Sequence, residues 1–166
     1  MARICDVAGY ACEAYRATHG QDIDEMKLQK LLYFAQRESY ALLGKELFEE
    51  DMEGWIHGPV SPQVRKRFHD GTLQGKNLDI ASRRIVNNVV MEYGNLSSLS
   101  LREMSHREES WRNSRKGMAA DAPGNNAIAK EDIRKDAMKV RPFDYAYGMY
   151  YDEFDDYDGG GDCSIQ

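Results

Sequence analysis

The sequence predicts a mainly α-helical fold with one short extended, β-like element. Apolar residues recur at helical spacing in several segments, strand-like alternation is scarce, and the helical period is lost in a Gly- and Pro-containing stretch around residues 53–60. The chain has 166 residues, of which 42% are hydrophobic and 30% are charged. This length and composition are typical of a single folded domain with its own core.

The first two predicted helices follow each other closely. Helical spacing of apolar residues predicts a helix over about residues 3–18, with Gly20 at its end. A second helix is expected to begin near Asp22, with Glu25 three positions on, and to end at Gly44. One face of this second helix is defined by periodic positions: Leu28, Leu31, Leu32, Ala35, Ser39, Leu42 and Leu43.

An extended element and a third helix come next. Residues 53–60 are expected to be extended, since Gly58 precedes a proline and is thereby disfavoured from the helical region. The pair Ser61-Pro62 is typical of an N-cap and the first helical position, so a helix is predicted to about Phe68.

Three further helices complete the predicted domain. Apolar spacing from Ile80 to Tyr93 predicts a helix that ends at Gly94, and a shorter helix over residues 96–104 follows, capped by Asn95 or Ser97. Residues 119–126 read as a loop, and a last helix is expected over about residues 129–138.

The C-terminal residues differ sharply in composition from the rest. Residues 1–141 hold all 22 Lys and Arg and 21 of the 28 Asp and Glu, so this part carries about one net positive charge, whereas the last seven acids lie beyond Arg141. Seven aromatic residues lie between Phe143 and Tyr157. We therefore divide the chain into a helical domain, 1–141, and an acidic, Tyr-rich extension, 142–166, whose asymmetry indicates an interaction segment.

Catalytic and metal-binding signatures are missing from the sequence. Cys5 and Cys12 lie on an apolar helix face, and the histidines show no ligand spacing. Phosphate-binding loops and nucleophile elbows are absent as well. We therefore expect no enzyme, no metal and no cofactor. With no apolar signal core and no apolar run of membrane length, we expect a cytoplasmic protein with no membrane partner.

Basic residues gather at Arg65-Lys66-Arg67, at Arg83-Arg84 and around Arg112. On a domain of about one net positive charge, such clusters are more typical of solvated helix faces than of a nucleic-acid footprint. A DNA-binding regulator that uses the helix after Ser61 stays open as an alternative.

Three short segments follow one another along the chain: Met26-Lys27-Leu28-Gln29-Lys30-Leu31-Leu32-Tyr33-Phe34-Ala35-Gln36, Gly44-Lys45-Glu46-Leu47-Phe48 and Glu53-Gly54-Trp55-Ile56-His57-Gly58-Pro59-Val60. In this order, they resemble the Panacea domain. Proteins of this family include phage-associated and genetic-element proteins. The resemblance extends over roughly residues 1–140, with Ser110 to Arg115 similar to its C-terminal part. It departs at Arg37-Glu38-Ser39, where aromatic residues are expected.

This resemblance implies a helical antitoxin that neutralises a cognate protein toxin by direct binding. The paired toxins include small alarmone-synthetase-like enzymes, and some relatives are adaptors that deliver the toxin to a protease, which gives a second alternative. Because Lys27, Gln29, Lys30 and Tyr33 fall on or near the face opposite the apolar stripe, the hypothesis is that toxin contacts come from three of them and from the segment around Gly58: Lys27, Lys30, Tyr33, Trp55 and His57.

The acidic extension supplies the remaining candidate contacts. Toxins that act on nucleotides or RNA have basic sites for phosphates, which an acidic segment with aromatic rings can occupy. The residues concerned are Tyr150, Tyr151, Asp155 and Asp156. Two alternatives remain open: residues 143–151 pack on the domain and leave a solvated end, or the acidic segment masks a basic face of its own domain.

Overall fold

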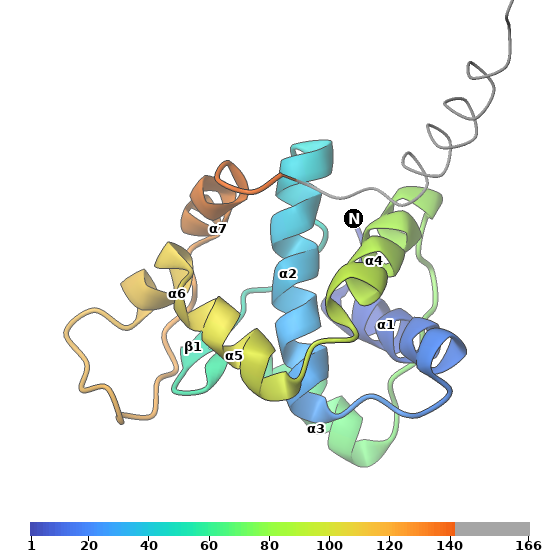
Figure 1. Ribbon diagram of the computed structural model, residues 1–166, viewed down its shortest axis with the longest axis horizontal. Helices are drawn as coiled ribbons and strands as arrows, with labels where there is room; N and C mark the ends of the chain where they lie inside the picture. Colours follow the sequence, from blue (N-terminus) through green and yellow to red (C-terminus); the bar gives the residue numbers. More distant parts are fainter. Residues whose placement is uncertain (142–166) are drawn as a thin grey trace, which may run out of the picture.

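The computed structural model describes residues 1–141, and within them a long central helix is surrounded by shorter ones (Figure 1). The central helix α2 contacts helices on both sides and the second strand of a small hairpin. The elements in chain order are α1 (Ile4–His19), α2 (Glu25–Leu43), β1 (Glu53–Trp55), β2 (Gly58–Val60), α3 (Pro62–Asp70), α4 (Ile80–Tyr93), α5 (Ser98–His106), α6 (Glu109–Ser114) and α7 (Lys130–Ala137). The predicted fold class is confirmed.

Helix ends follow from short polar caps and from glycine. Ser61 and Ser97 accept a backbone N–H with their side chains at the starts of α3 and α5, and Gly20 and Gly44 end α1 and α2 in the left-handed conformation. At the start of α2 the cap is Asp24, which accepts from the backbone N–H of Lys27 at 2.9 Å. The predicted start near Asp22 is therefore two residues early.

The hairpin is antiparallel and is extended by a loop from far along the chain. Glu53 pairs with Val60 and Trp55 with Gly58, and the backbone N–H of Gly54 donates to the carbonyl of Asn126 at 2.9 Å. The backbone N–H of Ile128 donates to Met52 at 2.7 Å. The predicted extended element is confirmed, and these bonds fix the loop that follows α6 against β1.

Burial surrounds α2 on every side. All residues from Lys27 to Ser39 are buried, because α1, α3, α4, α5, α7 and β2 pack around this helix. The expectation that Lys27, Gln29, Lys30 and Tyr33 lie on an outward face is wrong: their exposed fractions are 9%, 2%, 1% and 0%. A helix in the middle of a domain has no solvent-facing side over these turns.

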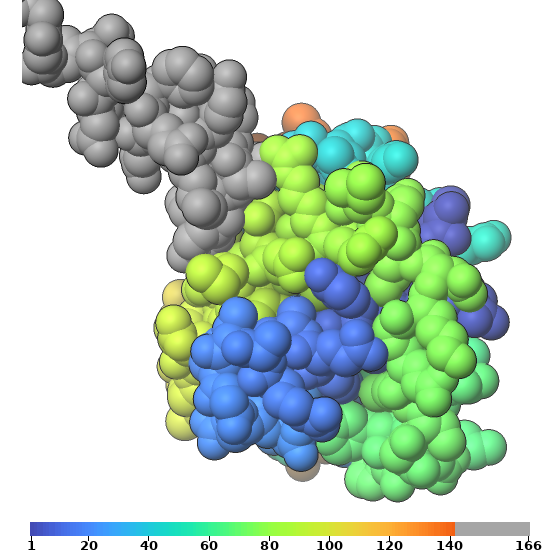
Figure 2. Space-filling view, turned by 90° about the vertical axis from the view of Figure 1, so that its right-hand side faces the viewer, coloured from blue at the N-terminus to red at the C-terminus, as the bar shows by residue number. Residues whose placement is uncertain are grey.

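Helix α1 and the segment that follows α3 pack closely against each other. Figure 2 shows α1 beside the chain that joins α3 to α4. Here the backbone of Gln74 passes so close to Gly9 that a Cβ on Gly9 would lie 2.2 Å from a carbonyl carbon. Glycine inside α1 is thus required by packing. On α4, Ile80 departs from the predicted apolar face and is 79% exposed.

Candidate protein-binding site

Two buried residues of α2 attach the hairpin to the central helix. The Gln29 amide pairs with both backbone groups of Ser61, accepting from its N–H at 2.9 Å and donating to its carbonyl at 3.1 Å. The Lys30 ammonium donates to the carbonyl of Pro59 at 3.2 Å. Because backbone groups are saturated by side chains of a buried helix, β2 and the start of α3 have a fixed position.

Two other polar residues of α2 hold different loops. The Gln36 amide accepts from Leu47 N–H at 2.7 Å and donates to the carbonyl of Phe48 at 2.9 Å. The Lys27 ammonium donates to the carbonyl of Gly94, at 3.0 Å, at the end of α4. The polar positions of the α2 motif therefore bind backbone of the same domain.

Where aromatic residues were expected, Arg37 forms a buried charged network. Its guanidinium contacts Glu108 at 2.6 Å and Glu38 at 3.1 Å, and it lies 4.7 Å from the centre of the Phe34 ring. Next to it, the hydroxyls of Tyr33 and Ser110 are 2.7 Å apart, and burial raises the pKa of Tyr33 well above its ordinary value. This network ties α6 to α2.

Lys30 is an unusual group in this arrangement. It makes no ion pair with any residue in the range 1–141, and burial, with a smaller contribution from Arg102, lowers its pKa to about 8. Space beside it is limited, because a Cβ on Gly58 would lie 2.5 Å from the Lys30 side chain. Gly58 has a φ of 112°, a conformation that L side chains rarely adopt.

The tip of the hairpin carries the accessible side chains. His57 is exposed, and Trp55 and Ile56 are half-buried. The indole N–H of Trp55 donates to the carboxylate of Glu53 at 2.6 Å, and the Arg65 guanidinium lies 5.7 Å from its ring centre. Beside the tip is an apolar hollow of about 370 Å³, which Trp55 and Ile56 share with residues 123–125. We call it the Trp55 hollow.

A second and larger hollow lies on the other side of Ile56. It has a volume of about 530 Å³ and is lined by α5, α6 and the loop that follows α6. The Trp111 indole N–H donates to the carbonyl of Trp55 at 2.9 Å, and the His106 ring stacks on Trp111 with centres 4.0 Å apart. We call this the Trp111 hollow. The hairpin tip and both hollows form one surface, the hairpin face: Trp55, Ile56, His57, Arg102, His106, Trp111 and Arg112.

A family comparison identifies the domain to which these elements belong. The model of the antitoxin SocA-like, Panacea domain family matches residues 28–112, just over half of the chain. The chain belongs to this family. The matched part of the Panacea domain begins within the α2 motif and ends at Arg112, so it includes all seven residues of the hairpin face. No curated protein and no solved structure matches the chain.

The structure of the Panacea domain separates the sequence-predicted contacts. Trp55 and His57 lie together on the hairpin, and Lys30 lies beneath them against Pro59. Lys27 and Tyr33 are buried at other contacts of α2. Tyr150, Tyr151, Asp155 and Asp156 lie outside the described residues. Sequence reasoning did not include Arg102, His106 and Trp111, although a second tryptophan near a charged run was a usable signal.

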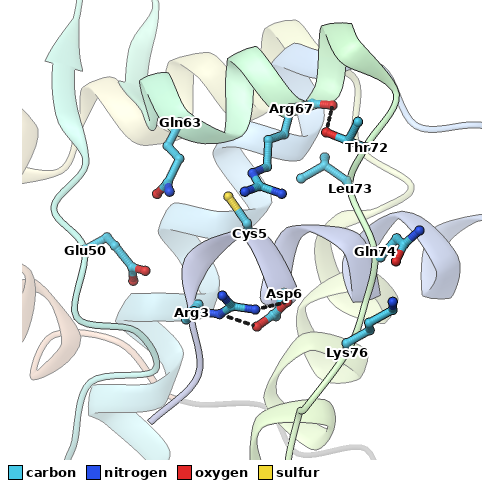
Figure 3. Close-up of a pocket in the computed structure, with 10 residues that line it drawn as sticks. All are labelled: Arg3, Cys5, Asp6, Glu50, Gln63, Arg67, Thr72, Leu73, Gln74 and Lys76. Carbon is cyan, nitrogen blue, oxygen red and sulfur yellow. Dashed lines mark hydrogen bonds and ion pairs between the residues drawn. The ribbon is translucent and has the colours of Figure 1, made fainter.

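A further pocket of the Panacea domain, of about 230 Å³, lies between α1 and α3 (Figure 3). Arg67 and Cys5 face each other at its centre, and Arg3 pairs with Asp6 at 2.9 Å. Burial raises the pKa of the Cys5 thiol, with Arg67 opposing the shift, so the thiol stays protonated at neutral pH. This arrangement does not make Cys5 a nucleophile.

Across residues 1–141, no three His, Cys, Asp or Glu side chains form a group that could hold a metal ion. In the same range, no helix is both long enough and apolar enough to cross a membrane.

Proposed function

We propose that this Panacea-domain protein neutralises a cognate protein toxin by binding it directly through the hairpin face, without catalysing a reaction. The observation that carries the proposal is the accessible set of Trp55, Ile56 and His57, on a turn whose backbone is bound by side chains of α2 and α6. Aromatic side chains on a rigid support are the usual anchors of protein interfaces.

Rigidity of the hairpin supports this role. Lys30 and Gln29 hold β2, and the indole of Trp111 holds the carbonyl of Trp55. A partner that docks here orders few new groups, so less of the interaction energy is lost in fixing the hairpin. The buried motif residues contribute by positioning the contacts, and they do not themselves meet the toxin.

Basic groups on the same face indicate the chemistry of the partner. Arg102 and Arg112 border the aromatic residues, so a partner with carboxylates around an apolar patch fits this surface. On α3, by contrast, Glu25 pairs with the first residue of the basic run, Arg65, at 2.7 Å and with the nearby His69 at 2.8 Å. This geometry favours a protein partner over DNA.

Growth rescue tests the proposal. The chain is co-expressed with the product of the adjacent open reading frame, and complex formation is measured by co-purification. Trp55→Ala is expected to abolish rescue, since an interface anchor contributes on the order of 2 kcal/mol or more to binding. His57→Glu serves as a second variant, because His57 is exposed and its replacement leaves packing unchanged.

The matched control is Lys66→Glu, an exposed charge reversal on α3 at a position that lines neither the Trp55 hollow nor the Trp111 hollow. Circular dichroism establishes that each variant is folded. Full rescue by both folded hairpin variants would contradict the proposed surface. Rescue that depends on a protease, or salt-dependent DNA binding by the unmodified chain, would favour the adaptor or the regulator instead.

A further inference from the structure

The Trp111 hollow carries positive charge that the described part of the chain leaves uncompensated. Neither Arg102 nor Arg112 forms an ion pair within residues 1–141. Arg115, which is buried, donates only to main-chain carbonyls, those of Gly54, Ala119 and Ala122, at 3.0, 3.3 and 2.6 Å. Against these three guanidinium groups the lining contains a single carboxylate, Asp121. The hollow therefore attracts anions.

The same hollow offers flat, apolar surface. Trp111 and His106 stack with their rings nearly parallel, at 8°, and Ile56 lies beside them. The Nε2 atom of His106 is buried and has no hydrogen-bond partner in the described structure. Burial, Arg102 and Lys30 lower the pKa of His106, in keeping with the surrounding positive charge. A ligand that combines carboxylates with aromatic rings matches both properties.

Such a ligand is present in the chain itself. Residues 142–166 contain seven Asp and Glu, no Lys or Arg, and seven aromatic residues between 143 and 157. The negative charge of this segment thus complements the positive charge of the hollow, and its aromatic rings can pack on the rings of the hollow. Within the domain, which has about one net positive charge, residues 46–53 hold five Asp and Glu but only one aromatic residue, Phe48.

The chain reaches the hollow with length to spare. The Lys139 ammonium pairs with Glu109 at 2.7 Å, which places the chain just before the extension at the start of α6. Trp111 and Arg112 lie within the next turn of that helix, a distance of about 5 Å along the axis. Residues 142–166 span about 80 Å when fully extended, at about 3.3 Å per residue.

We infer that the acidic, aromatic segment 143–157 binds in the Trp111 hollow of its own domain, with its carboxylates toward Arg102 and Arg112 and its rings against Trp111 and Ile56. In the absence of a partner, the segment then covers the part of the hairpin face that lines the Trp111 hollow. The inference does not depend on the toxin. It assigns the extension an intramolecular partner, and any molecule that occupies the hollow must displace it.

Proteolysis of the full-length chain tests this inference. Chymotrypsin cleaves after aromatic residues, and the rate of cleavage within 143–157 reports whether the segment is bound. The double variant Arg102→Glu/Arg112→Glu is expected to increase this rate about fivefold, and 0.5 M NaCl is expected to act in the same direction, because partly exposed charge pairs are screened by salt. Lys66→Glu is the control and should leave the rate unchanged.

A charge swap separates binding from a general loss of stability. Asp155→Arg/Asp156→Arg, combined with the Arg102→Glu/Arg112→Glu pair, should restore slow cleavage at the upstream aromatic residues 143–151. An unchanged rate in the folded Arg102→Glu/Arg112→Glu variant would overturn the inference. Protection that grows with protein concentration would also overturn it, since the segment would then bind a second copy.

Discussion

Lys30 shows how a residue that resembles a surface contact takes part in folding. Its ammonium lies within the domain, bound to the carbonyl of Pro59, and burial brings its pKa from 10.5 to about 8. The charged form is therefore disfavoured in the folded state relative to the unfolded chain. Between about pH 8 and 10.5 the unfolded state binds more protons, so the contribution of Lys30 to stability rises with pH in this window.

Replacement of Lys30 by Met should remove this contribution. The difference in free energy of unfolding between the original chain and Lys30→Met is expected to change in favour of the original chain by about 3 kcal/mol from pH 7.5 to 10.5. Urea unfolding at several pH values measures it. Taking the difference cancels the tyrosines and thiols that titrate in the same range. The exposed Lys66→Met provides the control, and a flat difference for Lys30→Met would show that Lys30 is not desolvated.

Gln36 gives a second prediction at this scale. Gln36→Leu leaves the backbone N–H of Leu47 and the carbonyl of Phe48 buried without partners. The expected cost is about 3 kcal/mol of unfolding free energy, since each orphaned group loses roughly 1–3 kcal/mol. Chemical denaturation compares it with Gln63→Leu, at an exposed position of α3. Equal midpoints for the two variants would contradict the role assigned to the Gln36 amide.

At the scale of elements, the hairpin depends on one glycine. Gly58→Ala introduces a methyl group in a positive-φ conformation, 2.5 Å from Lys30 and 2.6 Å from the Ser105 hydroxyl. The turn must then move away from α2 and α5, at a cost of about 2 kcal/mol or more. A lower melting temperature, together with faster hydrogen exchange at Val60 than at Leu31, is the expected result. Gly71→Ala is the control, because Gly71 ends a helix at a positive φ and an added methyl group there meets no other atom. Its melting temperature should fall less than that of Gly58→Ala.

The elements that sequence could predict are those with local signals. Residues 4–19, 25–43, 80–93 and 98–106 combine apolar periodicity with caps, and the structure has helices there. Helix α6 was not predicted: it has six residues, too few for two turns of periodicity, and its N-cap, Glu108, makes no side-chain cap bond. The Glu108 carboxylate instead forms an ion pair with Arg37, a contact that sequence spacing does not reveal.

For the molecule as a whole, the candidate site could be predicted only in part. Trp55 and His57 were identified because they are neighbours in a distinctive motif. The hairpin face also needs Arg102 and Trp111, which join it because α5 and α6 pack on the strands. The loop near Asp121 joins it through the return of the chain to β1. The burial of Lys27, Lys30 and Tyr33 could not be predicted, because periodicity defines an apolar stripe and cannot show that other elements cover the polar side.

The side-chain bonds of α2 to its own hairpin separate the residues that fix the hairpin from the residues at its tip. Since Gln29 and Lys30 recognise only main-chain atoms, they place no demand on which side chains occupy positions 55–57. Under the proposed function, sequence change at the tip can therefore alter which partner is recognised while the scaffold stays constant. Grafting residues 55–57 between two Panacea domains that share these bonds is thus expected to transfer partner recognition without loss of fold.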